Sequence, residues 1–367
     1  MKLNVLLLPG DGIGVEVLRE ASKVLRHVAD AFHHELSLSE GLLGGTAIHK
    51  TGSPFPEETR NLALQADATL LGAVGLPEFD NAPPHQRPES GLLGIRKALG
   101  VYANLRPVRS YRALLDSSPL KNHLVDGADM IIVRELTGGL YYGTPRGISG
   151  TGGEERAVNT MTYTRAEIER IAHMGFQLAR KRRKKVTSVD KSNVLENSQL
   201  WRRVVTELSS GYEDVTLEHI LVDNCAMQLV LNPKRFDVVL TENLFGDILS
   251  DEGAVLAGSI GMLPSASIGG KRPSGAWVGL YEPVHGSAPD IAGQNKANPL
   301  GAIGSVAAML EYSFGLMEEA QSVYRAIEEV LNGGRVTADL KPAGKPAGTT
   351  EVGDAVCDAL AARAASA

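Results

Sequence analysis

The sequence predicts an α/β protein of two domains, built on parallel strands that helices cover. Within residues 2–100, short apolar runs at 5–8 and 68–73 alternate with amphipathic stretches at 15–32 and 57–65. This alternation is typical of a parallel sheet with helices on its faces. The chain of 367 residues also exceeds one ordinary hydrophobic core, and we therefore expect two domains.

The middle of the chain begins with a predicted strand at 130–133 and continues with strand–helix units from 164 to 257. Between them, residues 135–158 are rich in Gly, Thr and Arg and lack a helical period, which favours a hairpin or arm over a linker. The basic run at 180–185 follows an amphipathic stretch at 165–179. Its charges suit the last turn of a helix, and we interpret it so rather than as a nucleic-acid patch.

The last third is predicted to be loop-rich over residues 263–299, where Gly-Gly, Pro-Ser and Ala-Gly pairs signal turns. Helical patterns at 300–316 and 318–332 follow, with a short one after Thr349. The repeated Lys-Pro-Ala-Gly at 341–348 predicts a surface loop.

The composition favours a small-molecule partner. The net charge is −6, from 37 basic and 43 acidic residues, which gives no electrostatic footprint for nucleic acid. No run approaches the roughly 18 apolar residues that a membrane helix needs. The two cysteines, Cys225 and Cys357, are far apart and predict no disulfide framework, and the first residues read directly as a strand. We therefore expect a cytoplasmic protein without a membrane partner.

The segment 242–251 places two carboxylates, Asp247 and Asp251, four residues apart at the start of a predicted helix. The preceding run at 236–241 is apolar and β-branched, as in a buried strand. Residues four apart share one helix face, where like charges repel and a cation between them would be stabilising. The alternative is an ordinary solvated helix start, with acidic residues near the positive end of the helix dipole.

Two further strand ends carry charged residues. The predicted strand at 184–189 ends just before Lys191, and the strand at 217–222 ends at Asp223. Ligands of open parallel sheets bind beyond the carboxyl ends of the strands, so we expect both residues at the same rim as the aspartate pair. Carboxylate oxygens suit a divalent metal ion, and a lysine there can transfer a proton. A simple ion-pair network is the alternative.

Three arginines, Arg96, Arg106 and Arg134, lie in different predicted elements. A guanidinium group is a rigid fork that binds a carboxylate through two parallel hydrogen bonds. Beside a metal site these arginines suit a small substrate with two carboxylates, although each alone would suit a surface ion pair.

The glycine cluster at 10–14 does not match the dinucleotide-binding fingerprint. That fingerprint needs a third glycine where this chain has Val15. We interpret the cluster as a tight strand-to-helix turn that requires glycine torsions.

In their order along the chain, these segments resemble the metal-dependent β-decarboxylating dehydrogenases, the isocitrate/isopropylmalate dehydrogenase family. The resemblance extends over nearly the whole chain, from PGDGIG at 9–14 to GTTE at 348–351. Its most specific motifs are NLRP at 104–107, RELTGGLY at 134–141, DKSNVL at 190–195, ENLFGDILSD at 242–251 and EPVHGSAPDIAG at 282–293.

The resemblance implies a fold and an assembly. The fold would be the two-domain α/β fold of this family, with domain 1 formed by both chain ends, residues 1–102 and 258–367. Domain 2 would be residues 103–257, with an arm at about 135–158. The resemblance also implies a homodimer with shared active sites, in which Lys191 and Asp223 enter from the partner subunit.

The resemblance further implies NAD as the cofactor, held by a loop outside the usual dinucleotide motif. The side chain of Asp290 would accept hydrogen bonds from the adenine ribose, which favours NAD over NADP, unless it only caps a turn after Pro289. The residues implied at this site are Glu282, His285, Gly286, Ser287, Ala288, Asp290, Ile291 and Asn298.

The implied reaction is oxidation and decarboxylation of a 2-hydroxy diacid with Mg²⁺ or Mn²⁺. The metal ligands would be Asp223, Asp247 and Asp251, with Asp223 also at the substrate, and the substrate carboxylates would meet Arg96, Arg106 and Arg134. Lys191 would help to remove the hydroxyl proton, hydride would pass to the nicotinamide, and CO₂ would leave. Tyr141 would then protonate the enol.

The substrate is expected to contact a loop that includes Glu89, Leu92 and Leu93. The two leucines would suit the isopropyl group of 3-isopropylmalate, which would be converted to 4-methyl-2-oxopentanoate in leucine biosynthesis. They could equally be core leucines of an amphipathic helix. Tartrate, malate or homoisocitrate are the alternative substrates. A non-catalytic regulatory subunit is disfavoured, because Lys191, Tyr141 and the aspartates are all present.

Overall fold

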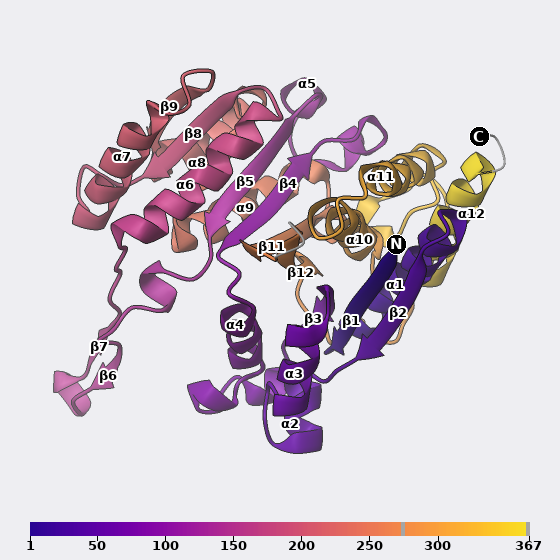
Figure 1. Cartoon of the computed structure of the whole chain (residues 1–367), viewed down its shortest axis with the longest axis horizontal. Helices are drawn as coiled ribbons and strands as arrows, with labels where there is room; N and C mark the ends of the chain where they lie inside the picture. Colours follow the sequence, from indigo (N-terminus) through magenta and orange to yellow (C-terminus); the bar gives the residue numbers. More distant parts are fainter. Residues whose placement is uncertain (273–275, 365–367) are drawn as a thin grey trace. The chain divides into compact units, whose positions relative to one another are not determined.

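The computed structural model describes residues 1–272 and 276–364, and its chain divides into two compact units (Figure 1). Unit 1 consists of Met1–Val101, Tyr111–Pro119 and Ala257–Ala367, and unit 2 of Tyr102–Ser110 and Leu120–Leu256. The predicted α/β class is confirmed. These contact-based units differ from our proposed domains mainly in the short segment 111–119, which belongs to unit 1.

Unit 1 has five neighbouring strands drawn from both chain ends. Their order is β2 (Glu35–Glu40), β1 (Lys2–Gly10), β3 (Ala68–Ala73), β12 (Trp277–Pro283) and β11 (Pro264–Lys271). The first four run parallel, and β11 is antiparallel to β12. Every residue of β3 is buried, as expected for a central strand covered on both faces.

Helices from both ends of the sequence pack on this sheet. Helices α1 (Gly14–Ala31) and α10 (Leu300–Tyr312) contact its central strands, and α10 is buried along most of its length. Helices α3 (Glu57–Gln65) and α4 (Pro88–Leu99) contribute to an apolar cluster with β1, β3 and β12. The remaining helices of unit 1 are α2 (Gly45–Thr51), α11 (Met317–Asn332) and α12 (Thr349–Ala364).

The expectation that residues 263–299 would be loop-rich was wrong in part, because β11 and β12 lie there. Strand β11 buries Ser265, Ala266, Ser267 and Ile268. Small side chains fill this part of the core, so the segment lacks the branched apolar run that predicts a buried strand.

Unit 2 has the strand order β4 (Ala103–Arg109), β5 (Asp129–Glu135), β10 (Val238–Thr241), β8 (Lys185–Asp190) and β9 (Thr216–Leu221). The last four are parallel, and β4 is antiparallel to β5. The carboxyl ends of four neighbouring strands therefore meet at one edge of the sheet. Its helices are α5 (Asn122–Val125), α6 (Arg165–Arg180), α7 (Glu196–Ser209), α8 (Val222–Leu231) and α9 (Asn243–Ala254).

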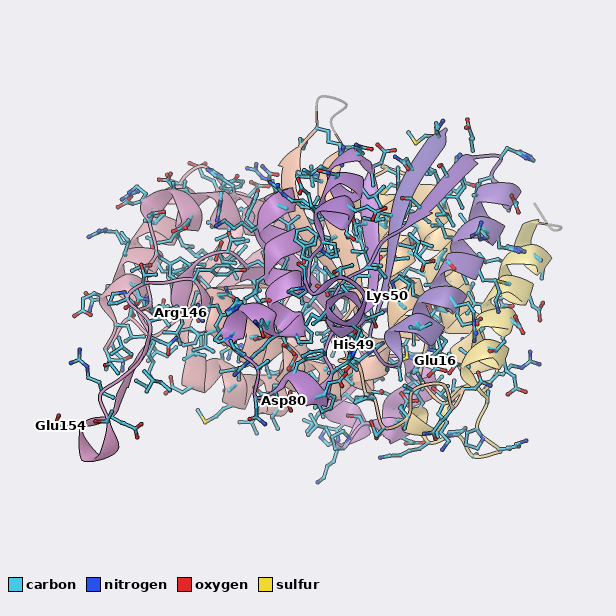
Figure 2. The ribbon with its side chains drawn as sticks, turned by 90° about the horizontal axis from the view of Figure 1, so that it is seen from below. Glu16, His49, Lys50, Asp80, Arg146 and Glu154 are labelled. Carbon is cyan, nitrogen blue, oxygen red and sulfur yellow. The ribbon has the colours of Figure 1, made fainter. Side chains whose placement is uncertain are left out.

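The predicted arm is present in unit 2. Strands β6 (Gly147–Ser149) and β7 (Arg156–Val158) form an antiparallel pair whose residues are all exposed. Figure 2 shows the segment from Arg146 to Glu154 extending away from the body of unit 2. Within residues 1–272 and 276–364, none of the helices combines the length and the apolar composition that a membrane span requires.

Candidate active site

Helix α9 presents the predicted carboxylate pair. It begins directly after β10, where the side chain of Glu242 caps it by accepting a hydrogen bond from the Phe245 N–H. Asp247 and Asp251 follow one turn apart, with 34% and 60% of their side chains exposed. The two carboxylates therefore share one face of α9 at the edge of the sheet, as the sequence predicted.

Two buried arginines approach this face from neighbouring strands. Nη1 of Arg134 contacts Asp247, and Nη1 of Arg106 donates to Asp251 Oδ1 at 3.1 Å. Arg106 Nη2 also lies 3.7 Å from Asp247 Oδ1. Because Asn104 is paired with Arg134 in the β4–β5 register, Arg106 and Arg134 point to the same face of the sheet. The sheet register thus brings the two arginines together.

Sequence reasoning missed the residues that orient Arg106. Its Nε donates to Asn104 Oδ1 at 2.8 Å, and its Nη1 donates to Ser250 Oγ at 2.6 Å. The available signal was spacing, because Asn104 lies two residues before Arg106 on the same strand face, and Ser250 lies next to Asp251.

Tyr141 joins the same carboxylate. It ends the short helix η4 (Gly139–Tyr141), and its Oη donates to Asp247 Oδ2 at 2.7 Å. Burial, together with the hydrogen bond to Asp247 and the negative charge of that group, raises the pKa of Tyr141 to about 12. The phenol is therefore a proton donor at neutral pH.

Lys191 and Asp223 lie together but do not complete a metal site within one chain. Lys191 Nζ donates to Asp223 Oδ1 at 2.8 Å, and this hydrogen bond lowers the pKa of Asp223 below its usual value. Across residues 1–272 and 276–364, no three His, Cys, Asp or Glu side chains are grouped to hold a metal ion. The predicted ligand set of Asp223, Asp247 and Asp251 is thus not assembled by a single chain.

The turn that carries Lys191 is fixed by its neighbours. The buried carboxylate of Asp190 accepts a hydrogen bond from the Ser192 N–H at 2.9 Å and binds Arg202 through two hydrogen bonds. The Lys191 N–H donates to Ser198 Oγ at 3.1 Å. The backbone of Lys191 is therefore held at the end of β8.

Unit 1 holds Arg96 beside the predicted cofactor loop. Its Nη2 donates to Glu282 Oε1 at 2.7 Å, and its buried Nε has no partner within the described part of the chain. A buried N–H donor that lacks a hydrogen-bond acceptor suits an anionic ligand such as a carboxylate. Glu282, near the end of β12, therefore links this arginine to the start of the predicted cofactor loop.

The predicted substrate loop is only partly open. Leu92 and Leu93 are half-buried, and Leu92 packs against the apolar cluster that includes Ile95 and Leu280. The alternative of a core leucine therefore applies in part to Leu92. Glu89 is exposed.

The predicted cofactor loop is tied to the glycine turn at 10–14. The Ile13 N–H donates to the Ser287 carbonyl oxygen at 2.7 Å. Gly12 has a φ of +54°, and a Cβ at this position would lie 2.1 Å from the same oxygen. The turn therefore needs glycine for close approach of two backbones, a role that sequence reasoning did not identify.

The side chains of the cofactor loop differ in their exposure. Burial lowers the pKa of His285, whose Nε2 has no partner in the described structure. Ser287 is buried, whereas Gly286 and Asp290 are exposed, and Ala288 and Ile291 are half-buried. Asn298 is buried, accepts a hydrogen bond from the Leu300 N–H and donates one to Asp339.

Comparison with known proteins decides the family. Residues 4–356 match the family model described as isocitrate/isopropylmalate dehydrogenase. The chain belongs to this family. It is therefore an oxidoreductase of the isocitrate/isopropylmalate dehydrogenase family, as the sequence motifs indicated.

Two relatives cover all or nearly all of this family member. A 3-isopropylmalate dehydrogenase from Shouchella clausii is 55% identical over 367 residues, covering 100% of both chains. One from Geobacillus kaustophilus is 58% identical, covering 93% of this chain and 91% of that protein. Both carry the same enzyme name.

Solved structures share the fold. Isocitrate dehydrogenase from Methylococcus capsulatus gives a TM-score of 0.86 at 34% identity, covering 98% of this chain and 99% of that one. A β-decarboxylating dehydrogenase from Thermococcus kodakarensis gives 0.78 at 36% identity, covering 98% and 96%. The α/β fold of this family member is thus shared with an isocitrate dehydrogenase and with a β-decarboxylating dehydrogenase.

Proposed function

We propose that this chain catalyses the NAD-dependent oxidative decarboxylation of 3-isopropylmalate to 4-methyl-2-oxopentanoate, a step of leucine biosynthesis in the cytoplasm. The observation that carries the proposal is the convergence of Arg134, Arg106 and Tyr141 on the carboxylate pair of α9. The shared name of relatives at 53–58% identity supports the choice of substrate.

Asp247 and Asp251 would hold Mg²⁺ or Mn²⁺, with Asp223 of a second subunit as a further ligand. Their side chains are 34% and 60% exposed, and carboxylate oxygens are the ligands that these hard cations prefer. When bound, the metal would act as a Lewis acid on the substrate hydroxyl and on the developing enolate. Arg106 and Arg134 already contact these carboxylates, so they are near enough to bind a substrate there.

The arginines would orient the substrate through its carboxylates. Arg106 and Arg134 are buried and held by side chains on either side, so their guanidinium planes are fixed before the substrate binds. Arg96 has an open buried Nε that a carboxylate would satisfy.

Proton transfer would fall to Lys191 and Tyr141. Lys191 would help to remove the hydroxyl proton, directly or through water, while hydride leaves the substrate for NAD. Tyr141 carries its proton at neutral pH, as a phenol does, and it would donate this proton to the enol carbon after CO₂ leaves.

A homodimer would complete the site. Helices α8 and α9 contact each other and carry exposed apolar side chains: Met227, Val230 and Leu231 on α8, Ile248 on α9, and Val255 directly after α9. An apolar face of this kind favours an interface, and a two-fold axis would bury the same face of both copies. The exposed arm residue Ile148 offers further apolar surface. Lys191 and Asp223 would then reach the carboxylate pair of the partner.

NAD would bind along the loop from Glu282 to Asn298. Asp290 is exposed and would accept hydrogen bonds from a ribose diol, whereas a 2′-phosphate would meet its negative charge. Lys296 donates to Gln294 Oε1 at 2.8 Å, so its amine is engaged within the loop. These features favour NAD over NADP.

Steady-state rates of NADH formation test the proposal. We expect 3-isopropylmalate to exceed malate, tartrate, isocitrate and homoisocitrate in kcat/KM. Each methylene in an apolar pocket contributes about 1–3 kcal/mol to such discrimination, so losing the isopropyl group should cost at least about tenfold. A better rate with malate or homoisocitrate would contradict the choice of substrate and the role given to Leu92 and Leu93.

A further inference from the structure

Asn243, the first residue of α9, is fully buried and uses all of its side-chain amide. Its Oδ1 accepts two hydrogen bonds from Arg134, from Nε at 3.0 Å and Nη2 at 2.8 Å. Its Nδ2 donates to the carbonyl oxygens of Leu136 at 3.2 Å and Gly138 at 3.0 Å. The amide therefore joins an arginine on one side to a turn on the other.

The arginine side of this contact leads to Asp247. Asn243 lies one helical turn before Asp247 on α9, and Arg134 spans both residues. Its Nε and Nη2 bind Asn243, while its Nη1 contacts Asp247. Two donors of one guanidinium that converge on a single buried acceptor restrain its orientation, so Asn243 sets the direction in which Nη1 points.

The turn on the other side leads to Tyr141. Leu136 and Gly138 precede η4, which delivers the Tyr141 phenol to Asp247 Oδ2. The turn is tightly enclosed, because a Cβ on Gly139 would lie 2.4 Å from the oxygen of Tyr163. That same oxygen accepts a hydrogen bond from the Asn243 N–H at 2.9 Å. Because Asn243 Nδ2 binds the carbonyl oxygens of Leu136 and Gly138, a change in the side-chain amide would be transmitted to η4.

We propose that Asn243 is a positioning residue that sets both Arg134 and Tyr141 against Asp247. This inference rests on the proposed function, in which Arg134 binds a substrate carboxylate and Tyr141 donates a proton. An amide suits the position because it offers an acceptor to the guanidinium and two N–H donors to the carbonyl oxygens. A carboxylate of the same size would serve the arginine and repel the turn.

Asn243→Asp separates the two contacts. It keeps an acceptor for Arg134 but turns an oxygen toward the carbonyls of Leu136 and Gly138. The buried oxygen costs stability, but the new carboxylate keeps its hydrogen bonds to Arg134 and gains an ion pair with it, so we expect the variant to fold with a lower melting temperature. In its crystal structure Arg134 should remain on residue 243, while the Tyr141 Oη moves away from Asp247. We expect kcat to fall roughly 10²-fold, the scale of a misplaced catalytic group, while KM for 3-isopropylmalate changes little.

Asn243→Ala removes both contacts and should raise KM as well, by about tenfold or more, because Arg134 also loses its fixed plane. Asn61→Asp on the exposed face of α3 makes the same chemical change far from the site in sequence, and it should leave kcat and KM unaltered.

The inference is overturned if the Asn243→Asp crystal structure keeps Tyr141 on Asp247. It is also overturned if both Asn243 variants lose thermal stability while kcat and KM of the folded fraction stay at wild-type values, which would indicate a structural role only. A wild type that does not oxidise 3-isopropylmalate would instead refute the proposed function. The crystallographic comparison would still decide whether Asn243 positions the two side chains.

Discussion

Replacing Gly12 with alanine should loosen the cofactor loop by a predictable amount. At this position φ is +54°, and an added Cβ would lie 2.1 Å from the Ser287 carbonyl oxygen, far inside van der Waals contact. The neighbouring Ile13 N–H donates to this oxygen at 2.7 Å. The Ser287 oxygen is a backbone atom, and the backbone of residue 12 fixes the position of its Cβ. The overlap can therefore be relieved only by moving the turn at 10–14 away from Ser287, which breaks this hydrogen bond.

Gly52→Ala is the matched control. Gly52 ends α2 with a φ of +77°, and a Cβ there would have no heavy atom within 4 Å. The control therefore measures only how much an alanine in the left-handed conformation lowers the free energy of unfolding, about 1 kcal/mol. Gly12→Ala adds about 1–3 kcal/mol of overpacking and about 1 kcal/mol for the lost hydrogen bond, so the free energy of unfolding should fall by about 3–5 kcal/mol in all.

Urea unfolding followed by circular dichroism, and NAD binding followed by NADH fluorescence competition, would measure the two consequences. Gly12→Ala should bind NAD at least about tenfold more weakly than Gly52→Ala, since a displacement of the binding groups on the order of 1 Å is enough for a loss of that size. Equal unfolding midpoints and equal NAD affinities in the two variants would refute the idea that this close approach fixes the cofactor loop.

Three other outcomes follow from the proposed site. Lys191→Met should retain the dimer and substrate binding but lower kcat by roughly 10²–10⁴, the usual range for lost acid–base catalysis, and near wild-type turnover would contradict the role of Lys191. Dialysis against a chelator should abolish turnover and added Mg²⁺ or Mn²⁺ should restore it, because Asp247 and Asp251 need a cation to bind a hydroxy acid; full activity after verified metal removal would argue against the site. Initial rates should favour NAD over NADP by at least tenfold, and Asp290→Lys should narrow that ratio. Equal use of both cofactors by the wild type would remove the basis for assigning Asp290 to the ribose.

The parts of the site that depend on helical spacing or on an apolar strand pattern could be predicted from the sequence. The spacing of Asp247 and Asp251 placed them on one face of α9, and the apolar run before them predicted β10. The ends of β8 and β9 likewise predicted that Lys191 and Asp223 would be neighbours, and their side chains are 2.8 Å apart. Helical and strand periodicity carries such information because it acts over a few residues.

The contacts made between elements were not accessible to the same reasoning. Arg106 and Arg134 meet α9 together because of the antiparallel register of β4 and β5, which depends on pairing between distant segments. No local pattern distinguishes Asn243 from other residues at the start of a helix. Its side-chain amide nevertheless connects Arg134, near the end of β5, to the turn that follows this strand. The need for glycine at position 12 can be recognised only once the loop containing Ser287 is seen to lie against it. Each of these depends on tertiary neighbours that no local pattern encodes.

The sheet of unit 1 contains strands from both ends of the chain, so neighbouring strands of this sheet leave the ribosome at different times. Strand β3 is buried at every residue, but its neighbour β12 begins about 200 residues later in the chain. At about 5–20 residues per second, translation would leave one edge of this apolar strand unpaired for roughly 10–40 s. Unit 2 ends at Leu256 and can be completed during that interval. The nascent chain therefore has a period in which the open edge of β3 is a target for chaperones or for aggregation, and a slower ribosome would lengthen it.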